Sequence, residues 1–577
     1  MTEQRSSRVR GQPARFHDEQ ATLHALAHAA AAESFPRLHV LADALPDSDS
    51  ESEEEEEEKR GEGSAAVAER NTWDTVYAAA PPHAFQPPHH DPPLPWDCSS
   101  ALDFFQLFCP PSFFDLIAAY TNAYAEEKHA ARKENAAPDS LAEEWAATDA
   151  REVAAMLGCL LYMGMVCMDD TKDYWAADTR QPFVADVFPR DRFLALLWNL
   201  RFNEQAELEA AEHDKLHQLR ILIDHIHDAA SKYFSPGEMQ SLDEAMVAFK
   251  GRSSMRQHIA KKKSPTGFKV WMLVDSATNF VVHFDVYTGA KGKAKEENAS
   301  ANVVLNLVQR GLTRRHHTIV MDGFFTSVYL LEKLLALQQY AVGTTRVNRK
   351  LFPKALVQGP SMQRGEWRWR QLRAHRQISI VSWMDRKPVN LISSRHDPTQ
   401  QSSITRREGR AQIAVSCPPV LNLYTKHLRG VDVFSQRQSY NKIGRRSKKY
   451  FYSLIWFLMD VAIHNAFILY LRKHTPQHFA EKDFRKQLMQ QLVDGYSSRR
   501  RPAAVHKRAR ASLHQLERTQ TAGACKECCK AVGRGGNNRR SRFQCADCGV
   551  HLCVPDCYNK HVQALAKHTD EAESEYA

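Results

Sequence analysis

Three aspartates stand in settings where an acidic residue is expected to have a task. Asp243 lies in the strand-like run "MQSLDEAMVAF", Asp322 ends the apolar run "TIVM", and Asp432 follows a Gly-Val turn in "LRGVDVF". Carboxylates from separate segments can hold a pair of divalent ions. Two such ions about 3.5–4 Å apart can activate an attacking oxygen and stabilise a leaving oxygen at a phosphodiester. This is the chemistry of nucleases, polymerases and transposases.

The alternative is three unrelated surface acids, because the chain holds 68 Asp and Glu residues. The local settings favour the metal site. An acid is disfavoured inside a strand such as the one around Asp243 unless it has a function. Asp322 marks the carboxyl end of a strand, where α/β sheets place functional groups.

A second site lies near the C-terminus, where seven of the twelve cysteines fall between residues 525 and 557. Two Cys-x2-Cys pairs separated by sixteen residues predict structural zinc. With a further cysteine pair and two histidines, eight ligands are present, enough for two tetrahedral ions; the alternative is a single ion with the remaining thiols free. The predicted ligands are Cys525, Cys528, Cys545, Cys548, Cys553, Cys557, His561 and His568. Such clustering fits a reducing intracellular compartment better than a secreted disulfide scaffold.

Basic residues cluster beside two of the aspartates, in residues 249–269 after Asp243 and 441–452 after Asp432. They could hold DNA against the metal site, or they could simply form a solvated face. A third stretch, 499–510, has the composition of a nuclear localisation signal, although the same residues could instead contact DNA. The candidate DNA-binding residues are Lys250, Arg252, Arg256, Lys261, Lys262, Lys263, Arg445, Arg446, Lys448 and Lys449.

The charge distribution supports a polyanionic partner. The formal net charge is +9, but residues 43–62 carry −9, which leaves +18 on the rest of the chain. A body this basic suits nucleic acid. In "EWRWR", Trp367 and Trp369 alternate with arginines; they could stack on bases or anchor a small β-unit.

The elements that must position these residues change character along the chain. Helical periodicity is replaced near residue 237 by short β-rich runs with helices between them, which predicts a layered α/β sheet. The apolar run 450–471 contains Asp460, His464 and Asn465 and is predicted to be a buried helix rather than a membrane span. The predicted parts are a disordered acidic region (1–95), a helical part (96–236), an α/β part (237–347), an Arg-rich insertion (348–418), a segment with the third aspartate (419–441), a second helical part with a basic segment (442–519) and a cysteine-rich part (520–570).

Several blocks together resemble the piggyBac family of transposases. They are "DEAMVAFKGRSSMRQHIAKKKSPTGFKVWMLVDS", "VMDGFFTSVYLLEKL", "WMDRKPVNLISS" and "GVDVFSQRQSY", preceded by "FFQLFCPPSFFDLIAAYTNAYA" and "EVAAMLGCLLYMGM". They follow the family's order with similar spacing, and the likeness runs from about residue 98 to residue 561.

The resemblance implies an RNase H-like catalytic core with Asp243, Asp322 and Asp432 as its metal-binding triad. It implies two catalytic Mg²⁺ ions, which Mn²⁺ can replace, and cut-and-paste transposition into TTAA targets by strand cleavage, hairpin formation and strand transfer. The helical parts would form a dimerisation and DNA-binding region. The C-terminal part would be a cross-brace domain with two zinc ions, in which the first and third ligand pairs share one ion and the second and fourth share the other.

Partners implied by the resemblance are double-stranded DNA, as terminal inverted repeats and TTAA target, and a second copy of the chain or a larger assembly. A nuclear location follows, and no membrane is expected. Two positions depart from the family pattern: Ser435 stands where a further Asp is common, and Gly323 where Asn is usual. A domesticated DNA-binding descendant without transposition therefore remains the alternative, and an RNase H-like nuclease that does not transpose is a weaker third.

Overall fold

The structure, a computed structural model, divides into two compact units, Met1–Tyr496 and Ser497–Ala577. The residues that it describes are 72–134, 145–203, 214–260, 262, 264–289, 298–443, 449–476, 478–498, 516–528, 539–545, 548–553, 557 and 560–561.

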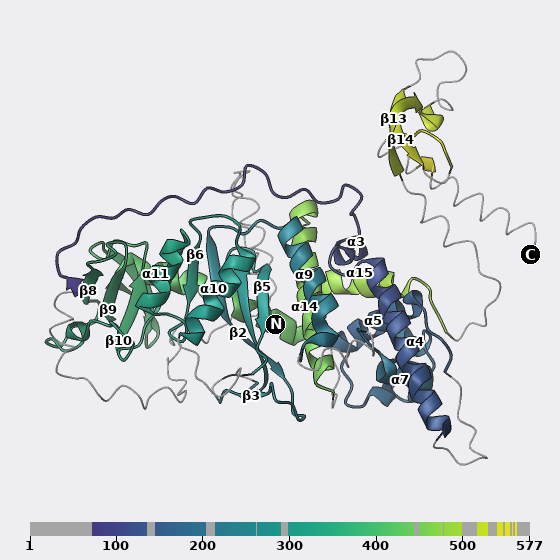
Figure 1. Cartoon of the computed structure of the whole chain (residues 1–577), viewed down its shortest axis with the longest axis horizontal. Coiled ribbons are helices and arrows are strands. Elements are labelled where there is room, and N and C mark those ends of the chain that lie inside the picture. Colours follow the sequence, from purple (N-terminus) through teal and green to yellow (C-terminus); the bar gives the residue numbers. More distant parts are fainter. Residues whose placement is uncertain are drawn as a thin grey trace, which may run out of the picture. The chain divides into compact units, whose positions relative to one another are not determined.

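A mixed sheet forms the centre of the first unit (Figure 1). Its core strands are β2 (Met239–Ala248), β4 (Thr266–Asp275), β5 (Val281–Val286), β6 (Thr318–Met321) and β7 (Tyr340–Thr344). They lie side by side in the order β5-β4-β2-β6-β7. Strand β2 is antiparallel to β4 but parallel to β6, and β6 is parallel to β7. The parallel strands therefore end at one edge, where polar groups can gather.

The predicted insertion continues this sheet. Strand β10 (Pro388–Ser393) pairs with β7, and β9 (Ser379–Met384) and β8 (Trp367–Leu372) extend the order outward. A hairpin of β11 (Ser402–Glu408) and β12 (Ala411–Cys417) forms a separate two-stranded sheet. Across the other half of the core, the short β3 (Gln257–His258) pairs with β4.

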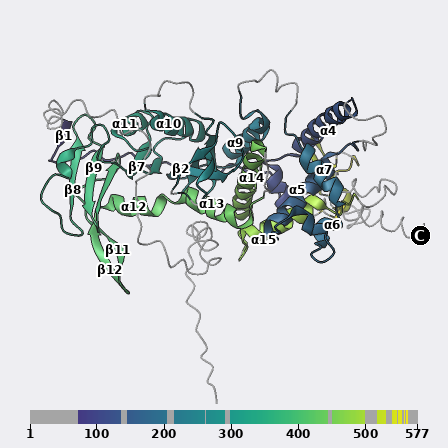
Figure 2. The ribbon, with the colours of Figure 1, turned by 90° about the horizontal axis from the view of Figure 1, so that it is seen from below.

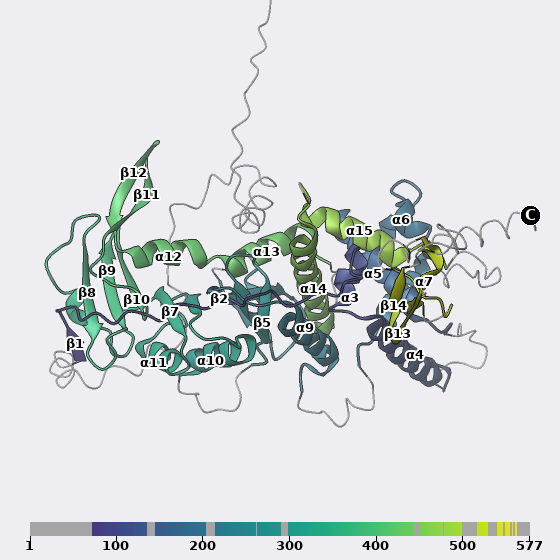
Figure 3. The same ribbon diagram turned by 90° about the horizontal axis from the view of Figure 1, so that it is seen from above.

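Helices cover both faces of the sheet. On one side lie α10 (Ala299–Gly311) and α11 (Val328–Ala336), and on the other lie α12 (Pro419–His427) and α13 (Gly430–Asn441) (Figures 2 and 3). Apolar stripes on these helices bury the sheet; Leu307 and Leu334, for example, are fully buried. This three-layer arrangement is the layered α/β architecture expected from the sequence.

A helical layer packs beside the sheet and joins segments far apart in the chain. Helices α14 and α15, which follow the sheet, pack against α3, α5 and α9, which precede it. The predicted two-part helical region thus closes into one body. Its helices are α3 (Ala101–Gln106), α4 (Pro111–Glu134), α5 (Ala150–Met165), α6 (Pro182–Ala185), α7 (Arg190–Asn199), α9 (Arg220–Tyr233), α14 (Tyr450–His474) and α15 (Glu481–Val493).

The N-terminal segment is ordered earlier than expected. Composition predicts disorder through residue 95, yet residues 72–95 lie along the first unit. The short β1 (Trp73–Asp74) pairs with β8 and covers its edge. Further along, the backbone N–H of His83 donates to the hydroxyl of Tyr340 at 2.7 Å, and Lys473 Nζ donates to the carbonyl of Pro95 at 2.9 Å. These contacts order a polar, Pro-rich segment that has no core of its own.

Helix α14 is the apolar run predicted to be a core helix. By length and composition alone it could cross a membrane, but 89% of its most apolar window is buried inside the protein. Its polar residues are paired there. Asp460 accepts from Arg485 Nη1 at 2.8 Å, Arg485 Nη2 lies 2.9 Å from Glu481, and His464 Nδ1 lies 2.9 Å from Glu481. Burial raises the pKa of Asp460 to about 6, although Arg485 acts in the opposite direction.

We expect Arg485→Met to lower the free energy of unfolding of the first unit by about 3–5 kcal/mol, because the substitution leaves Asp460 buried without its cation and removes one of the two partners of Glu481. Urea denaturation of the full chain, followed by tryptophan fluorescence, measures this loss.

Lys486→Met is the matched control on the same helix. Lys486 pairs with Asp483 at 3.3 Å, but both side chains are about half exposed, and removing such a surface pair costs roughly 0–1 kcal/mol. Equal stability of the two variants would contradict a structural role for the buried network.

Candidate active site

Two of the three predicted aspartates meet where β6 ends beside the middle of the parallel strand β2. Strand β6 finishes at Met321, which pairs with Leu242 in the middle of β2. The next residues, Asp243 and Asp322, therefore stand at neighbouring positions of the sheet. Asp322 begins a turn, and its Oδ1 accepts the backbone N–H of Phe324 at 3.0 Å. The strand contexts predicted from sequence are thus present, and parallel register brings them together.

Asp432 reaches the same region from a helix. The sequence suggests a Gly-Val turn before it, whereas the structure places it in the first turn of α13, which packs on β2. Gly430 allows this approach, since a Cβ there would lie only 2.8 Å from the Cβ of Ser241. The Ser241 hydroxyl also donates to the carbonyl of Leu428. The Asp432 side chain is exposed, whereas Asp243 is 9% exposed.

The three carboxylates are spread rather than clustered. Among the described residues, groups of three or more possible metal ligands with atoms within 4.8 Å of one another occur only in the second unit. The triad is therefore wider than a one-metal site. Two ions about 3.5–4 Å apart, each about 2 Å from its ligands, can bridge donors up to about 8 Å apart. A two-metal site thus does not require the three carboxylates to lie closer to one another than this.

The site is strongly acidic and partly buried. Burial raises the pKa of Asp243 well above its usual range, and the charge of Glu244 raises it further, while Lys262 opposes both. Burial and the charge of Glu244 likewise raise the pKa of Asp322. Carboxylates that share a buried site repel one another when all are ionised. A divalent cation bound among them offsets this repulsion and favours their ionised forms.

Glu244 and Lys269 also belong to the site, although neither was among its predicted residues. The Glu244 side chain is 10% exposed and lies 3.1 Å from Lys262 Nζ. Lys269 Nζ lies over the ring of Phe324, 4.3 Å from its centre. Two consecutive acids, Asp243 and Glu244, inside one strand were the signal that could have drawn attention to Glu244. Lys269 carries no such signal, because its position beside β2 depends on the register of β4 against that strand.

The predicted DNA-binding residues that the structure describes lie in three different settings. Lys250, Arg252 and Arg256 are exposed on the segment between β2 and β3, whereas Lys262 turns back onto Asp243 and Glu244. Lys449 directly precedes α14, and its Nζ lies 5.4 Å from the ring centre of Tyr124. The others lie outside the described residues, namely Lys261, Lys263, Arg445, Arg446 and Lys448.

The two tryptophans of the insertion serve as anchors. Trp367 Nε1 donates to the carbonyl of Pro398 at 3.0 Å, and both Trp367 and Trp369 pack on the apolar cluster around Trp383. Of the two interpretations of "EWRWR", these contacts favour the structural one. Ser435, one turn after Asp432 on α13, adds no carboxylate to the site.

In the second unit, β13 (Leu516–Ala524) and β14 (Arg540–Cys545) form a hairpin that carries the cysteines. The strand begins before the predicted boundary at residue 520. Two groups of possible metal ligands are brought together. The first is Cys525, Cys528, Cys553 and Cys557, and the second is Cys545, Cys548 and His561.

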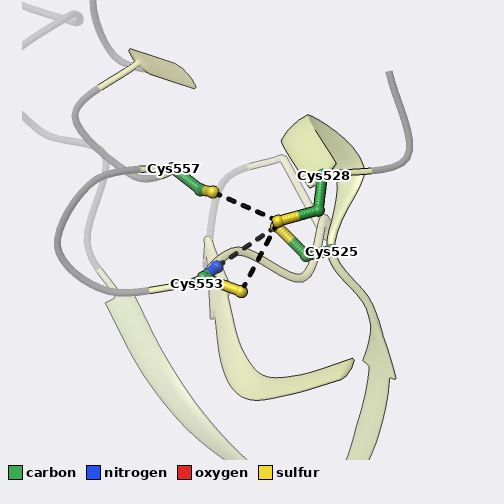
Figure 4. Close-up of side chains that lie close together, drawn as sticks. All are labelled: Cys525, Cys528, Cys553 and Cys557. Atoms are coloured by element: carbon green, nitrogen blue, oxygen red, sulfur yellow. Dashed lines mark hydrogen bonds between the residues drawn. The ribbon is translucent and has the colours of Figure 1, made fainter. Parts of the chain in front are cut away.

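The first group has the dimensions of a tetrahedral thiolate site (Figure 4). Cys528 Sγ lies 3.9 Å from Cys553 Sγ and 3.5 Å from Cys557 Sγ. Zn–S bonds of about 2.3 Å in a tetrahedron place the sulfurs about 3.8 Å apart. The grouping follows the alternating pattern that the resemblance implies. His568, the predicted eighth ligand, lies outside the described residues, as does Cys529.

Comparisons with known proteins agree with this picture. A family model described as "Transposase IS4" matches residues 100–467. The human "PiggyBac transposable element-derived protein 3" is 24% identical over 481 residues, which are 80% of this chain and 76% of that protein. The human "PiggyBac transposable element-derived protein 5" is 23% identical over 441 residues, covering 73% of this chain and 80% of that protein.

A solved structure shares the fold. It is the cryo-EM structure of a piggyBac transposase synaptic complex with hairpin DNA, which is 21% identical, with a TM-score of 0.61 over 79% of this chain and 95% of that one. The family model spans Asp243, Asp322 and the helix that carries Asp432. The chain belongs to the piggyBac family of transposases.

Proposed function

We propose that the protein is a DNA transposase that excises and inserts its element at TTAA sites by divalent-metal-dependent strand cleavage, hairpin formation and strand transfer. The observation that carries this proposal is the placement of Asp322 just after the end of β6, beside Asp243 in the middle of the parallel strand β2, with Asp432 on the helix α13 that packs on β2. Three acids from separate segments thus face one region, as phosphodiester chemistry requires.

The core supports an RNase H-like assignment. Three antiparallel strands, β2, β4 and β5, with the short β3 between the first two in the chain, are followed by the parallel strands β6 and β7 on the other side of β2. Helices cover both faces. In this arrangement the first strand is central, so that its acid, Asp243, lies next to the end of β6.

The residues present fit divalent ions. Carboxylate oxygens are the donors that Mg²⁺ and Mn²⁺ prefer, and the Lys262 ammonium already lies among them, 3.8 Å from Asp243 Oδ1. We propose that Asp243, Asp322 and Asp432 hold two Mg²⁺ ions, which Mn²⁺ can replace. When bound, such ions supply activation of the attacking oxygen and stabilisation of the leaving oxygen.

The chain's own residues would hold and orient the DNA. Exposed Lys250, Arg252 and Arg256 follow β2 directly and can contact backbone phosphates, which fix the register of the duplex. Each proposed step, namely first-strand cleavage, hairpin formation and target joining, is the displacement of one oxygen at phosphorus by another. One set of fixed carboxylates can therefore serve all three.

We further propose two structural zinc ions in the second unit and a DNA-binding role for that unit. The chemistry of the donors supports this: four thiols in one group, and two thiols with an imidazole in the other. A transposase joins paired ends, so we propose a homodimer or larger assembly acting in the nucleus, with the basic stretch 499–510 as an import signal.

The second candidate is a domesticated DNA-binding protein without transposition. It is favoured by the human relatives, whose names call them derived from transposable elements, and by Ser435. A cleavage assay separates the two. With Mg²⁺ and DNA carrying the inverted repeats that flank the gene next to TTAA, a transposase gives nicks and hairpins. Binding without any cleavage would establish the second candidate.

Neutralising Lys250, Arg252 and Arg256 with glutamine is expected to weaken DNA binding for all sequences alike. The slope of log K against log salt should become shallower by about 2.7, at about 0.9 for each lost phosphate contact. Fluorescence anisotropy with labelled duplex at several salt concentrations measures both effects.

The control neutralises three exposed lysines elsewhere in the same unit, Lys333, Lys354 and Lys387, and so removes the same total charge. It should leave the slope nearly unchanged. If both triple variants lose equal affinity, net charge alone attracts DNA, and the basic segment after β2 is not a contact surface.

A further inference from the structure

Lys262 lies inside the acidic site rather than on the DNA-facing surface where sequence placed it. It belongs to the turn between β3 and β4, which folds back because Ile259 N–H donates to the carbonyl of Pro265 at 2.7 Å. The Lys262 side chain is 32% exposed. Its ammonium is 3.1 Å from Glu244 Oε1 and 3.8 Å from Asp243 Oδ1.

Glu244 is the closer of the two partners, and it comes from the same strand as Asp243. One of its carboxylate oxygens faces Lys262, while the other, Oε2, is buried and has no hydrogen-bond partner among the described residues. A buried carboxylate is stable only when paired. Glu244 therefore anchors the lysine, and the lysine offsets the charge of Glu244 and of the neighbouring triad.

We propose that Lys262 is a resident counter-cation of the active site, that divalent ions must displace its ammonium, and that the released side chain then contacts a phosphate of the bound DNA. This rests on the proposed function, because it assumes that the triad binds metal. The ammonium must leave for an electrostatic reason, because an ammonium and a divalent ion that both lie within a few ångströms of Asp243 repel each other strongly. Lysine suits such an exchange, since it is a compact charge on a flexible stem.

The proposal predicts opposite effects of Lys262→Met on metal binding and on catalysis. Without DNA, the variant should bind Mn²⁺ at least about tenfold more tightly than the wild type, because no internal cation competes. With DNA and saturating Mn²⁺, it should cleave at least about tenfold more slowly, because a phosphate contact is missing. Electron paramagnetic resonance of free Mn²⁺ measures the first effect in the zinc-loaded full chain, and a single-turnover assay measures the second.

Three further variants make the result specific. Lys262→Arg keeps the charge and should not tighten Mn²⁺ binding. Lys232→Met removes an exposed lysine from α9 and should change neither property. Asp322→Asn should weaken Mn²⁺ binding. Melting curves show whether the variant is folded. Lys262→Met should have a lower melting temperature without Mn²⁺, because its carboxylates then have no cation beside them, and should regain the wild-type melting temperature with Mn²⁺.

Two outcomes would overturn the inference in distinguishable ways. If Asp322→Asn weakens Mn²⁺ binding while Lys262→Met leaves it unchanged or weaker, the metal site stands but Lys262 does not compete for it. If Mn²⁺ binding does not depend on Asp322 at all, the proposed active site fails, and the inference fails with it.

Discussion

Asp322→Asn is expected to lower cleavage of terminal-repeat DNA at least about 10³-fold, equivalent to about 4 kcal/mol of transition-state stabilisation, with DNA binding retained. The substitution removes one negative charge from the site but little volume. The amide oxygen can still accept the Phe324 N–H, which now lies 3.0 Å from Oδ1. The turn after β6 should therefore keep its shape, and the loss of rate reports on charge. A gel assay of nicks and hairpins under single-turnover conditions measures it.

Asp285→Asn is the matched control. Asp285 is a partly buried acid on β5, where it pairs in register with Trp271, and it lies outside the triad. Burial raises the pKa of Asp285 also, so a raised pKa alone does not distinguish it from Asp322. Its substitution should leave the cleavage rate within about twofold. Equal losses of cleavage rate in both variants would mean that the sheet does not tolerate Asp→Asn substitutions in general, and that Asp322 has no catalytic role of its own.

Cys528→Ser is expected to lower the zinc content of the chain by at least one ion and to unfold the second unit while leaving the first unit intact. Cys528 approaches both Cys553 and Cys557, so its loss opens the four-thiol group. The described residues of this unit form a hairpin with few buried apolar side chains, and structural zinc supplies about 10–16 kcal/mol of apparent binding free energy in comparable small domains. Elemental analysis gives the zinc content, and hydrogen exchange of residues 516–561 reports the unfolding.

Cys167→Ser provides the comparison, since Cys167 is an exposed thiol of the first unit. It should keep both ions and normal exchange. One zinc ion per wild-type chain would support the single-ion alternative. Full zinc content in Cys528→Ser would show that this thiol is not a ligand.

Much of the site could be predicted from local sequence, and what could not depends on long-range contacts. The apolar run before Asp322 is enough to mark a strand end, and the cysteine spacing is enough to indicate metal. The helix that contains Asp432 was harder to predict from sequence, because "GVDVF" offers no capping residue. The position of α13 depends instead on the close packing of Gly430 on Ser241. Register, which sequence does not reveal, brings Asp243 beside Asp322.

The positions of Glu244 and of residues 72–95 depend on partners distant in the chain. Glu244 pairs with Lys262, which lies eighteen residues later in the turn between β3 and β4. The N-terminal segment is ordered by β8 and by Lys473, hundreds of residues later. The insertion was expected to be a separate part, but hydrogen bonding between β7 and β10 makes it an extension of the sheet. Composition reports none of these pairings.

The most direct measurement is an anomalous-scattering map of the full chain crystallised with Mn²⁺ and terminal-repeat DNA. We predict manganese about 2.0–2.3 Å from carboxylate oxygens of Asp243, Asp322 and Asp432, with the Lys262 ammonium moved away from Asp243. Manganese bound elsewhere, or a triad member that stays beyond ligand distance with DNA in place, would contradict the proposed catalytic centre.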